Sequence, residues 1–317
     1  MSRRTLLILR LGVFAAACAF VYLRFSGDPG HALALHGALV EGLLRWPLLV
    51  PLLALMLLNW GLEAWKWHGL MRPVQRIGYG RAFAATVAGT AIGLITPNRV
   101  GEFAGRVLFL EPGHRIQGGF ATLLGSIAQF VVTLLVGGLV LGMGLWTPLE
   151  PGPVHVWRVV PWCALLIGLA AVFLYFSPKA FARLLPAIPG LRRYERQAHV
   201  LETFTTAQLV RVFLLSLARY AVFTAQFCIV LAVLAQVSPQ AGLRAVPVVF
   251  LLTTLVPTMA LTELGVRGSV ALALIPGDAA GVLASTVLIW TINLAVPALL
   301  GAVLLLLARI RATGDPA

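Results

Sequence analysis

Charged residues are scarce in this chain of 317 residues. They make up 11% of the sequence, and Lys66 and Lys179 are its only lysines, whereas hydrophobic residues make up 60%. An ordinary soluble domain has about 45–50% apolar and about 25% charged residues. A water-soluble fold of this length could not bury so much apolar surface. The composition therefore excludes a soluble enzyme or DNA-binding module and indicates a protein with several membrane-spanning helices.

Cysteines are few, and the common catalytic motifs are absent. The three cysteines, Cys18, Cys163 and Cys228, are odd in number and lie in separate apolar runs, which argues against a disulfide framework or a metal site. The six histidines have no metal-ligand spacing, and the sequence contains no His-Glu-x-x-His, Walker or Gly-x-Gly-x-x-Gly motif. We therefore expect no catalytic residues, no metal and no cofactor.

Six apolar runs are long enough to cross a bilayer, which takes about 20 helical residues. They are 5–23, 47–70, 118–146, 156–176, 207–236 and 280–308. We interpret the first run as a retained transmembrane helix and not as an export signal, because no clean cleavage signature follows it. The shorter, mixed segment 31–46 is expected to form an amphipathic helix on the membrane surface.

Two further apolar regions are interrupted by proline. Their arms are 82–96 and 99–110 around Thr96-Pro97-Asn98, and 246–256 and 263–275 around Pro257-Thr258. Each arm would be roughly 17–22 Å long at 1.5 Å per residue, enough to reach the middle of a bilayer and little more. Each region can therefore form either a re-entrant helical hairpin or one long helix kinked at its proline.

The positions of the basic residues favour the hairpins. With two hairpins and a cytoplasmic N-terminus, 16 of the 24 bases (Lys66 among them) lie in cytoplasmic segments, 4 in outer segments and 4 within the membrane. If both regions crossed fully, the most basic segment, 177–206, would lie outside, against the positive-inside rule. We therefore predict an all-α protein with about six spanning helices and two re-entrant hairpins. Its expected location is a bacterial-type inner membrane, with both termini cytoplasmic.

The two interrupted regions share a sequence pattern. In each, a proline break is followed by Glu-x-x-x-Arg and an apolar half-helix; the pairs are Glu102 with Arg106 and Glu263 with Arg267. In the predicted topology the first hairpin enters from the cytoplasm and the second from outside. The chain is therefore expected to form one membrane domain over 1–317, with an inverted repeat over 47–146 and 207–308.

Six ionisable residues lie at membrane depth in this topology. They are Arg99, Glu102, Arg106, Arg219, Glu263 and Arg267. Exposed to lipid, they would cost on the order of 15–20 kcal/mol, so they must face each other, water or a ligand. Each Glu precedes its Arg by four residues, the better orientation for a helical ion pair. This pairing leaves Arg99 and Arg219 unmatched, a surplus of two positive charges.

The hairpin tips add free backbone N–H groups to this charge. Asn98, Thr258 and Thr262 are expected to cap the half-helices, and a helix N-terminus beside arginine can bind a phosphate-like anion. We predict that the tips meet near the bilayer centre and hold an anionic or zwitterionic lipid headgroup. The predicted substrate-binding residues are Asn98, Arg99, Glu102, Arg106, Arg219, Thr262, Glu263 and Arg267. The alternative is that these ion pairs only hold the hairpins in the helix bundle.

Weaker polar signals lie inside the spans. Gln129, Gln226 and Asn293 each predict either an interhelical hydrogen bond or a residue of a transport pathway. The pairs Gly89/Gly93, Gly101/Gly105 and Gly138/Gly142 have the spacing of close helix packing.

The run from Thr96 to Arg106, Thr-Pro-Asn-Arg-Val-Gly-Glu-Phe-Ala-Gly-Arg, resembles the signature of the lysylphosphatidylglycerol synthase transmembrane-region family of flippase-like proteins. The stretch from Glu63 to Leu70, Glu-Ala-Trp-Lys-Trp-His-Gly-Leu, is similar to the family's basic-Trp stretch at the inner end of the second span. The segment from Pro257 to Arg267 has fewer glycines than the corresponding family segment. The resemblance covers about 5–308.

The resemblance implies that the protein moves lipid between the two leaflets, with a membrane lipid and no nucleic acid as its partner. The alternative is an intramembrane enzyme or an accessory scaffold in glycolipid, polyprenyl-phosphate or hopanoid metabolism, with a glycosyltransferase or lipid-synthesis enzyme as partner. Nine residues follow the last predicted span, so we expect no aminoacyl-transferase domain and no lipid aminoacylation by this chain alone.

Overall fold

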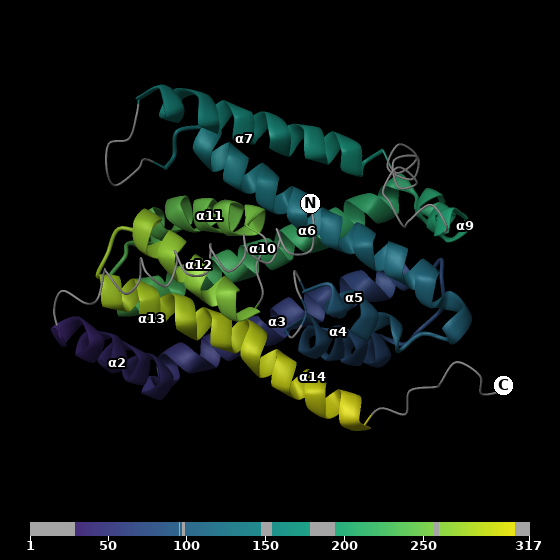
Figure 1. Cartoon of the computed structure of the whole chain (residues 1–317), viewed down its shortest axis with the longest axis horizontal. Helices are drawn as coiled ribbons and strands as arrows, with labels where there is room; N and C mark the ends of the chain where they lie inside the picture. Colours follow the sequence, from purple (N-terminus) through teal and green to yellow (C-terminus); the bar gives the residue numbers. More distant parts are fainter. Residues whose placement is uncertain are drawn as a thin grey trace, which may run out of the picture. The chain divides into compact units, whose positions relative to one another are not determined.

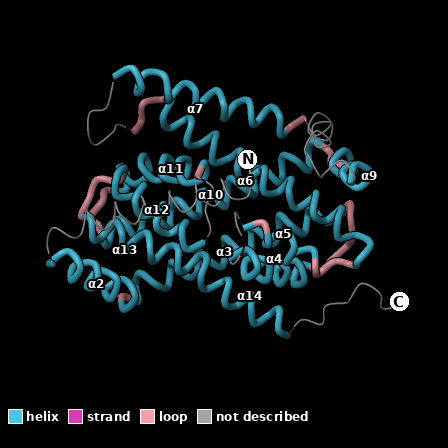
Figure 2. The backbone as a smooth tube through the Cα atoms, in the orientation of Figure 1, coloured by secondary structure: helices cyan, strands magenta, loops and turns pink. Residues whose placement is uncertain are grey.

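The computed structural model describes residues 29–94, 96, 99–146, 154–177, 194–256 and 260–307. Within these ranges every regular element is a helix, and short loops join the helices (Figures 1 and 2). This confirms the predicted all-α class. The predicted first span, 5–23, lies outside the described residues.

Four helices in the described ranges are long and apolar enough to cross a membrane. They are α3 (Trp46–Met71), η2 with α6 (Pro112–His114 and Arg115–Gly142), α10 (Thr206–Leu234), and the run Ala279–Leu307. The last run consists of α13 (Ala279–Trp290), the π-turn η6 (Thr291–Ala295) and α14 (Val296–Leu307). The predicted spans at 47–70, 118–146, 207–236 and 280–308 therefore correspond to helices that are long and apolar enough to cross a membrane. The six-span layout as a whole stays a prediction.

The other two apolar segments are also helical. The predicted span 156–176 forms α7 (Val154–Tyr175), and the segment 31–46 forms most of α2 (Pro29–Leu44). The described parts of both helices are apolar but shorter than the four helices above.

Hydroxyl groups inside the helices donate to backbone carbonyls one turn earlier, as Thr86 does to Ala82 at 2.8 Å. This local bond satisfies the hydroxyl where water is absent.

The chain forms two compact units. Unit 1 consists of 1–56, 136–165 and 222–295, and unit 2 of 57–135, 166–221 and 296–317. In unit 1, α13 packs against α2 and α12 (Ala260–Leu274), and α12 also packs against α11 (Pro239–Leu255). Ser238 caps α11 by accepting from the N–H of Ala241 at 3.3 Å, and Pro239 occupies the first helical position.

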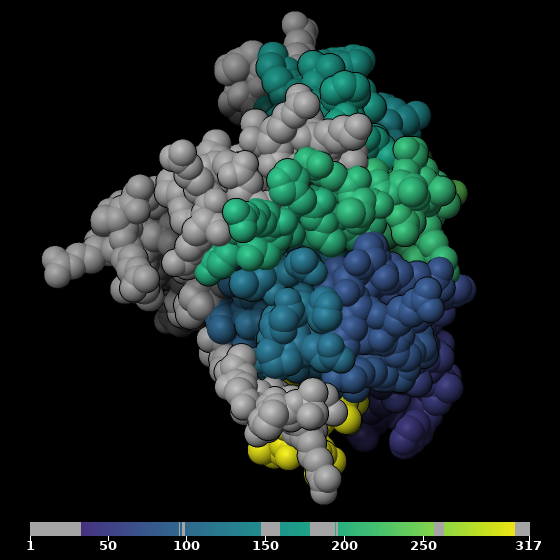
Figure 3. Space-filling model, turned by 90° about the vertical axis from the view of Figure 1, so that its right-hand side faces the viewer, coloured from purple at the N-terminus to yellow at the C-terminus, as the bar shows by residue number. Residues whose placement is uncertain are grey.

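Unit 2 has an apolar core that joins several helices. Trp67 and Met71 of α3, Phe120 of α6 and Leu209 of α10 are among its buried residues. The core also includes residues of α9 (Glu195–Ala198) and η5 (His199–Thr203). Figure 3 shows the blue surface of α4, α5 and the start of α6 beside the green surface of α9 and the start of α10. Apolar packing therefore holds the long helices of unit 2 together.

The first proline-interrupted region forms a helical hairpin and not a kinked helix. Helices α4 (Tyr79–Leu94) and α5 (Gly101–Val107) pack side by side (Figure 1), and α14 packs against α4. A Cβ added to Gly105 would lie 2.7 Å from the Cα of Gly89, so the two backbones touch at these glycines. This confirms the close packing that the glycine spacing predicts. Whether the hairpin enters the membrane from one side stays a prediction.

Thr96 and Arg99 shape the turn of this hairpin. The Thr96 hydroxyl donates to the carbonyl of Ile92 at 3.1 Å and accepts from the N–H of Gly101 at 2.8 Å, so one side chain links both arms. Arg99 has φ +56°, in the left-handed backbone conformation that residues other than glycine rarely adopt. The turn therefore places Arg99 at the tip at the cost of local backbone strain.

Candidate functional site

Three polar residues of α3 occupy one face of an otherwise apolar helix in unit 2. Asn59, Glu63 and Lys66 are spaced i, i+4 and i+7, which brings their side chains onto the same side. All three are buried, with Glu63 at 4% and Lys66 at 1% exposure. A carboxylate and an ammonium group at this depth need partners, and neighbouring helices supply them.

The carboxylate of Glu63 contacts three cations. Its Oε1 accepts from Arg106 Nη1 of α5 at 2.6 Å, and its Oε2 lies 2.7 Å from Lys66 Nζ of the same helix. Its Oε2 also pairs with Arg219 Nη1 of α10. One buried carboxylate therefore joins helices that are far apart in sequence.

Glu102 is the second carboxylate of the site. Its Oε1 pairs with Arg106 Nη2 one turn later on α5, and its Oε2 lies 3.4 Å from Arg99 Nη2. Arg106 therefore bridges Glu102 and Glu63, one through each terminal nitrogen. The ion pair that the i, i+4 spacing predicts for Glu102 and Arg106 is confirmed.

Neutral polar groups complete the surroundings of the cations. Arg219 Nε donates to Asn59 Oδ1 at 2.9 Å, and its Nη1 donates to Gln129 Oε1 of α6 at 3.4 Å. Lys66 Nζ donates to Ser216 Oγ of α10 at 3.4 Å and to a carbonyl of α6. Gln129 Nε2 donates to the carbonyl of Ser216, which confirms an interhelical hydrogen bond for Gln129.

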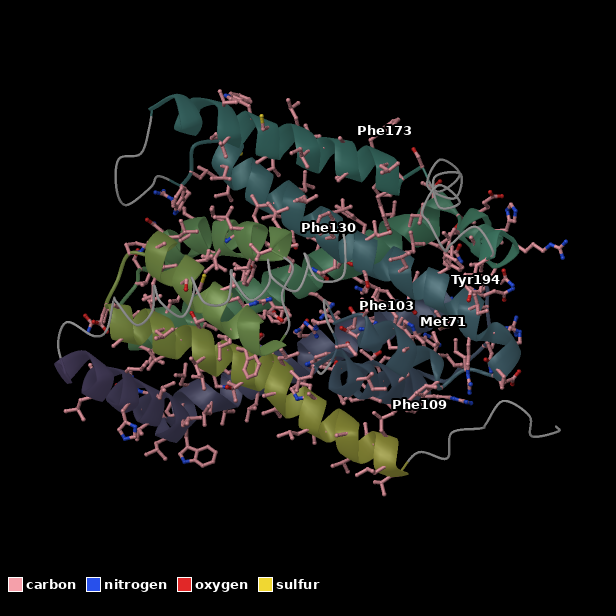
Figure 4. The ribbon with its side chains drawn as sticks, viewed as in Figure 1. Met71, Phe103, Phe109, Phe130, Phe173 and Tyr194 are labelled. Carbon is pink, nitrogen blue, oxygen red and sulfur yellow. The ribbon has the colours of Figure 1, made fainter. Side chains whose placement is uncertain are left out.

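We call these six ionised residues the Glu63 cluster: Glu63, Lys66, Arg99, Glu102, Arg106 and Arg219. The Glu63 cluster holds four cations and two carboxylates, so it carries two surplus positive charges. Figure 4 shows nitrogen- and oxygen-bearing side chains gathered beside α5, where Phe103 is labelled. The side chain of Arg99 is the most open, at 33% exposure.

Several donors at the cluster have no hydrogen-bond partner among the described residues. They are Asn59 Nδ2, Arg99 Nε and Arg106 Nε, all shielded from solvent. An unpaired buried donor costs free energy, and an anionic ligand would remove that cost. No three His, Cys, Asp or Glu side chains in the described ranges could hold a metal ion. The chemistry that the cluster offers is anion binding.

The predicted residues of the second hairpin lie in unit 1. Glu263 Oε1 of α12 pairs with Arg267 Nη2 one turn later at 2.6 Å, as the spacing predicts. Asn98 lies outside the described residues, as does the side chain of Thr262. The prediction that the two hairpin tips meet therefore stays a prediction.

One prediction about unit 2 is wrong. Arg99 and Arg219 are not unmatched, because Glu102 pairs with Arg99 and Glu63 pairs with Arg219. Lys66, which is predicted to lie in a cytoplasmic segment, is buried against Glu63 and α10, and its side of the membrane stays a prediction. Pairing by i, i+4 spacing omits Glu63, which lies inside the helix bundle. The spacing of Asn59, Glu63 and Lys66 on one helix face is the signal that identifies them.

The turn before α5 belongs to the expected helix N-terminal site. The cap predicted for Asn98 lies outside the described residues. Helix α5 has seven residues, and the hydroxyl of Thr96, which precedes the proline, accepts from the N–H of Gly101. Arginine and lysine side chains supply the formal positive charge of the described part of the site.

Comparison with known proteins identifies the family of the chain. The family model for the lysylphosphatidylglycerol synthase TM region matches residues 7–301 of the chain. No curated protein sequence matches it. The matched range includes every residue of the Glu63 cluster and both helical hairpins. The apolar spanning helices and this match together make the chain an integral membrane protein. It belongs to the lysylphosphatidylglycerol synthase TM region family.

Proposed function

We propose that the protein moves an anionic or zwitterionic phospholipid between leaflets, and that the Glu63 cluster binds the headgroup phosphate during passage. The observation that carries this proposal is the surplus of two positive charges in the Glu63 cluster, whose side chains are buried except for the partly open Arg99, Glu102 and Arg219. Family membership supports a role in lipid chemistry, since the family is named after a lipid synthase. The protein would act as a transporter and not as an enzyme.

The charge balance favours ligand binding over a purely structural network. A network that only joined helices would be expected to balance its charges, because an uncompensated charge is costly away from water. Four cations and two carboxylates instead leave two positive charges, and the singly charged phosphodiester of one phospholipid headgroup would offset one of them. Arginine is suited to this ligand, because its planar guanidinium can donate two parallel hydrogen bonds to phosphate oxygens.

The membrane topology is part of this proposal. We infer that the α4–α5 and α11–α12 hairpins are re-entrant, that the two halves are inverted repeats, and that both termini are cytoplasmic. The element order supports the repeat: a long helix, a helical hairpin and a long helix occur over α3–α6 and again over α10–α14. A reporter inserted between 185 and 200 should be cytoplasmic. An extracellular reporter would overturn the topology.

The transport proposal is tested in proteoliposomes with an acyl-labelled fluorescent phosphatidylglycerol. Impermeant dithionite bleaches the outer leaflet only, so wild-type protein should raise the bleached fraction above that of protein-free vesicles. Replacing Arg99 and Arg106 with Gln should abolish the increase while the protein still inserts. Arg45→Gln is the matched control, because Arg45 forms an exposed ion pair with Glu41. Normal transport by the Arg99/Arg106 variant would contradict the proposal.

Native mass spectrometry of the purified protein addresses the lipid and the enzyme question together. A phospholipid that copurifies with wild type and is lost in Arg99→Gln protein would identify the headgroup class. Incubation of that lipid with the protein should return it chemically unchanged. A new lipid product formed by wild type and not by Arg99→Gln protein would establish an enzyme and contradict the transporter assignment.

A further inference from the structure

A second basic site lies in unit 2, where α3 ends. A cavity of about 420 Å³ is lined by His68 of the last turns of α3 and by Arg72, Arg76 and Ile77 of the following connection. Its volume falls within the range of about 300–1,000 Å³ that is typical of ligand sites. None of these residues belongs to the Glu63 cluster.

The walls of this cavity are held in place by the core. Met71 and Val74 alternate with the arginines and are buried, and the N–H of Val74 donates to the carbonyl of Met71 at 2.9 Å. Gln75 Oε1 accepts from the N–H of Glu111 at 3.0 Å, which ties the connection to the segment before α6. These contacts hold in place the backbone segment that carries Arg72 and Arg76.

An aromatic contact fixes the helical side of the cavity. The rings of His68 and Tyr79 meet edge to face, with centroids 6.5 Å apart. The Tyr79 hydroxyl donates to the carbonyl of Gly61 at 3.1 Å and so holds the start of α4 against α3. The site is therefore built from fixed elements on both sides.

The cavity is basic and its charge is not compensated by protein. No carboxylate lines it, and neither Arg72 nor Arg76 forms an ion pair with any described residue. Arg72 and Arg76 are exposed, whereas Arg106 and Arg219 pair with glutamates inside the bundle. Two arginines that line a cavity without a carboxylate can both donate hydrogen bonds to a bound anion.

The position along α3 indicates which kind of anion can reach the cavity. Helix α3 has 26 residues, about 39 Å at 1.5 Å per residue, and exceeds the hydrocarbon core of about 30 Å. Its end therefore reaches the headgroup layer, where anionic phospholipids present their phosphates. Ile77 adds an apolar wall that suits the glycerol and upper acyl carbons of such a lipid.

We propose that this cavity binds the phosphate of an anionic lipid headgroup at the membrane surface. Arg72 and Arg76 donate to the phosphate oxygens, and His68 and Ile77 line the remaining walls. The site is separate from the Glu63 cluster, and the proposal holds whether or not the protein transports lipid. Its failure would therefore leave the transport proposal untouched.

The test measures binding of a short-chain fluorescent phosphatidylglycerol to the full-length protein in neutral detergent. Phosphatidylcholine with the same chains and inorganic phosphate are the comparison ligands. Replacing both Arg72 and Arg76 with Gln should weaken phosphatidylglycerol binding about tenfold or more. Arg81→Gln is the matched control, because Arg81 is exposed near the start of α4 and does not line the cavity. It should bind like wild type.

Parallel measurements in Arg99→Gln protein separate this site from the Glu63 cluster. The loss on replacing Arg72 and Arg76 should be the same in that background. Unchanged phosphatidylglycerol binding in the Arg72/Arg76 variant would overturn the proposal, as would equal losses in Arg81→Gln protein. If inorganic phosphate bound as tightly as phosphatidylglycerol, and the Arg72/Arg76 variant lost that binding, the cavity would be a site for the free anion. This result would also overturn the lipid assignment.

Discussion

The same Glu-x-x-x-Arg pattern occurs in two helical hairpins with very different surroundings. On α5, Arg106 bridges Glu102 and Glu63, and Glu63 extends the contacts to α3 and α10. On α12, the described ion pair joins Glu263 and Arg267, and residues 257–259 before the helix lie outside the described residues. The Arg106 side chain is 6% exposed, whereas that of Arg267 is 31% exposed. Among the described residues, the shared motif therefore forms part of a buried network in one hairpin and an i, i+4 pair in the other.

The difference lies in what the neighbouring long helix supplies. Helix α3 presents Glu63 to Arg106 of the first hairpin, and Asn59 and Lys66 contact α10, so the pair on α5 becomes part of a larger charged cluster. An isolated, partly exposed ion pair contributes little to stability, whereas a buried pair is costly to break. The first hairpin should consequently be far more sensitive to substitution than the second.

Glu63→Gln should destabilise the protein more than any other single substitution in either hairpin network. Removing this carboxylate leaves Lys66, Arg106 and Arg219 buried without their shared counter-charge. Breaking one buried pair costs about 3–5 kcal/mol, so we expect a loss of about 5 kcal/mol in unfolding free energy. Denaturant unfolding in detergent, followed by tryptophan fluorescence, measures it. Glu41→Gln removes an exposed acid and should change stability by less than about 1 kcal/mol. Equal effects of the two would contradict the network.

Arg106→Gln and Arg267→Gln compare the two hairpins directly. Arg106→Gln removes the bridge between two carboxylates and should cost about 3 kcal/mol, together with most of the lipid transport. Arg267→Gln should cost less than Arg106→Gln, because the Arg267 side chain is 31% exposed and pairs with one described carboxylate, whereas Arg106 pairs with two. The same unfolding and dithionite assays measure both variants. A larger loss for Arg267→Gln would reverse the comparison and point to partners of the second hairpin outside the described residues.

The glycines of the two hairpins give a test that involves no charge. A Cβ at Gly105 would lie 2.7 Å from the backbone of Gly89, whereas a Cβ at Gly268 would meet only the tip of Leu283 at 2.9 Å. Gly105→Ala should therefore destabilise the protein by about 1–3 kcal/mol through overpacking. Gly268→Ala should be close to neutral, because the Leu283 side chain can move and alanine favours the helix. A thermal unfolding comparison of the two variants decides this.

The sequence predicts the local parts of this site and misses the non-local ones. The ion pairs on α5 and α12 follow from i, i+4 spacing, and the contact of α4 with α5 follows from glycine spacing. The partner of Arg219 does not follow from spacing, because Glu63 lies 156 residues away and only the fold brings α3 beside α10.

The polar residues inside the spans form hydrogen bonds either within their own helix or to a neighbouring helix. Gln129 and Gln226 form interhelical hydrogen bonds, one of the two roles predicted for them. Asn293 instead donates to the carbonyl of Ile289 in its own helix, where the chain forms a π-turn. An amide side chain can satisfy itself locally or across helices, and sequence alone does not distinguish these outcomes.

Arg99→Gly should separate the function of the first hairpin from its stability. Arg99 and Gln236 are the non-glycine residues with positive φ among those described, at +56° and +54°. Relief of the left-handed strain should raise the unfolding free energy by about 1 kcal/mol in Arg99→Gly and equally in the control Gln236→Gly. Arg99→Gly also removes the most open cation of the Glu63 cluster, so its transport should fall while that of Gln236→Gly stays normal. Wild-type transport by the stabilised Arg99→Gly protein would refute the proposed role of Arg99 in lipid binding.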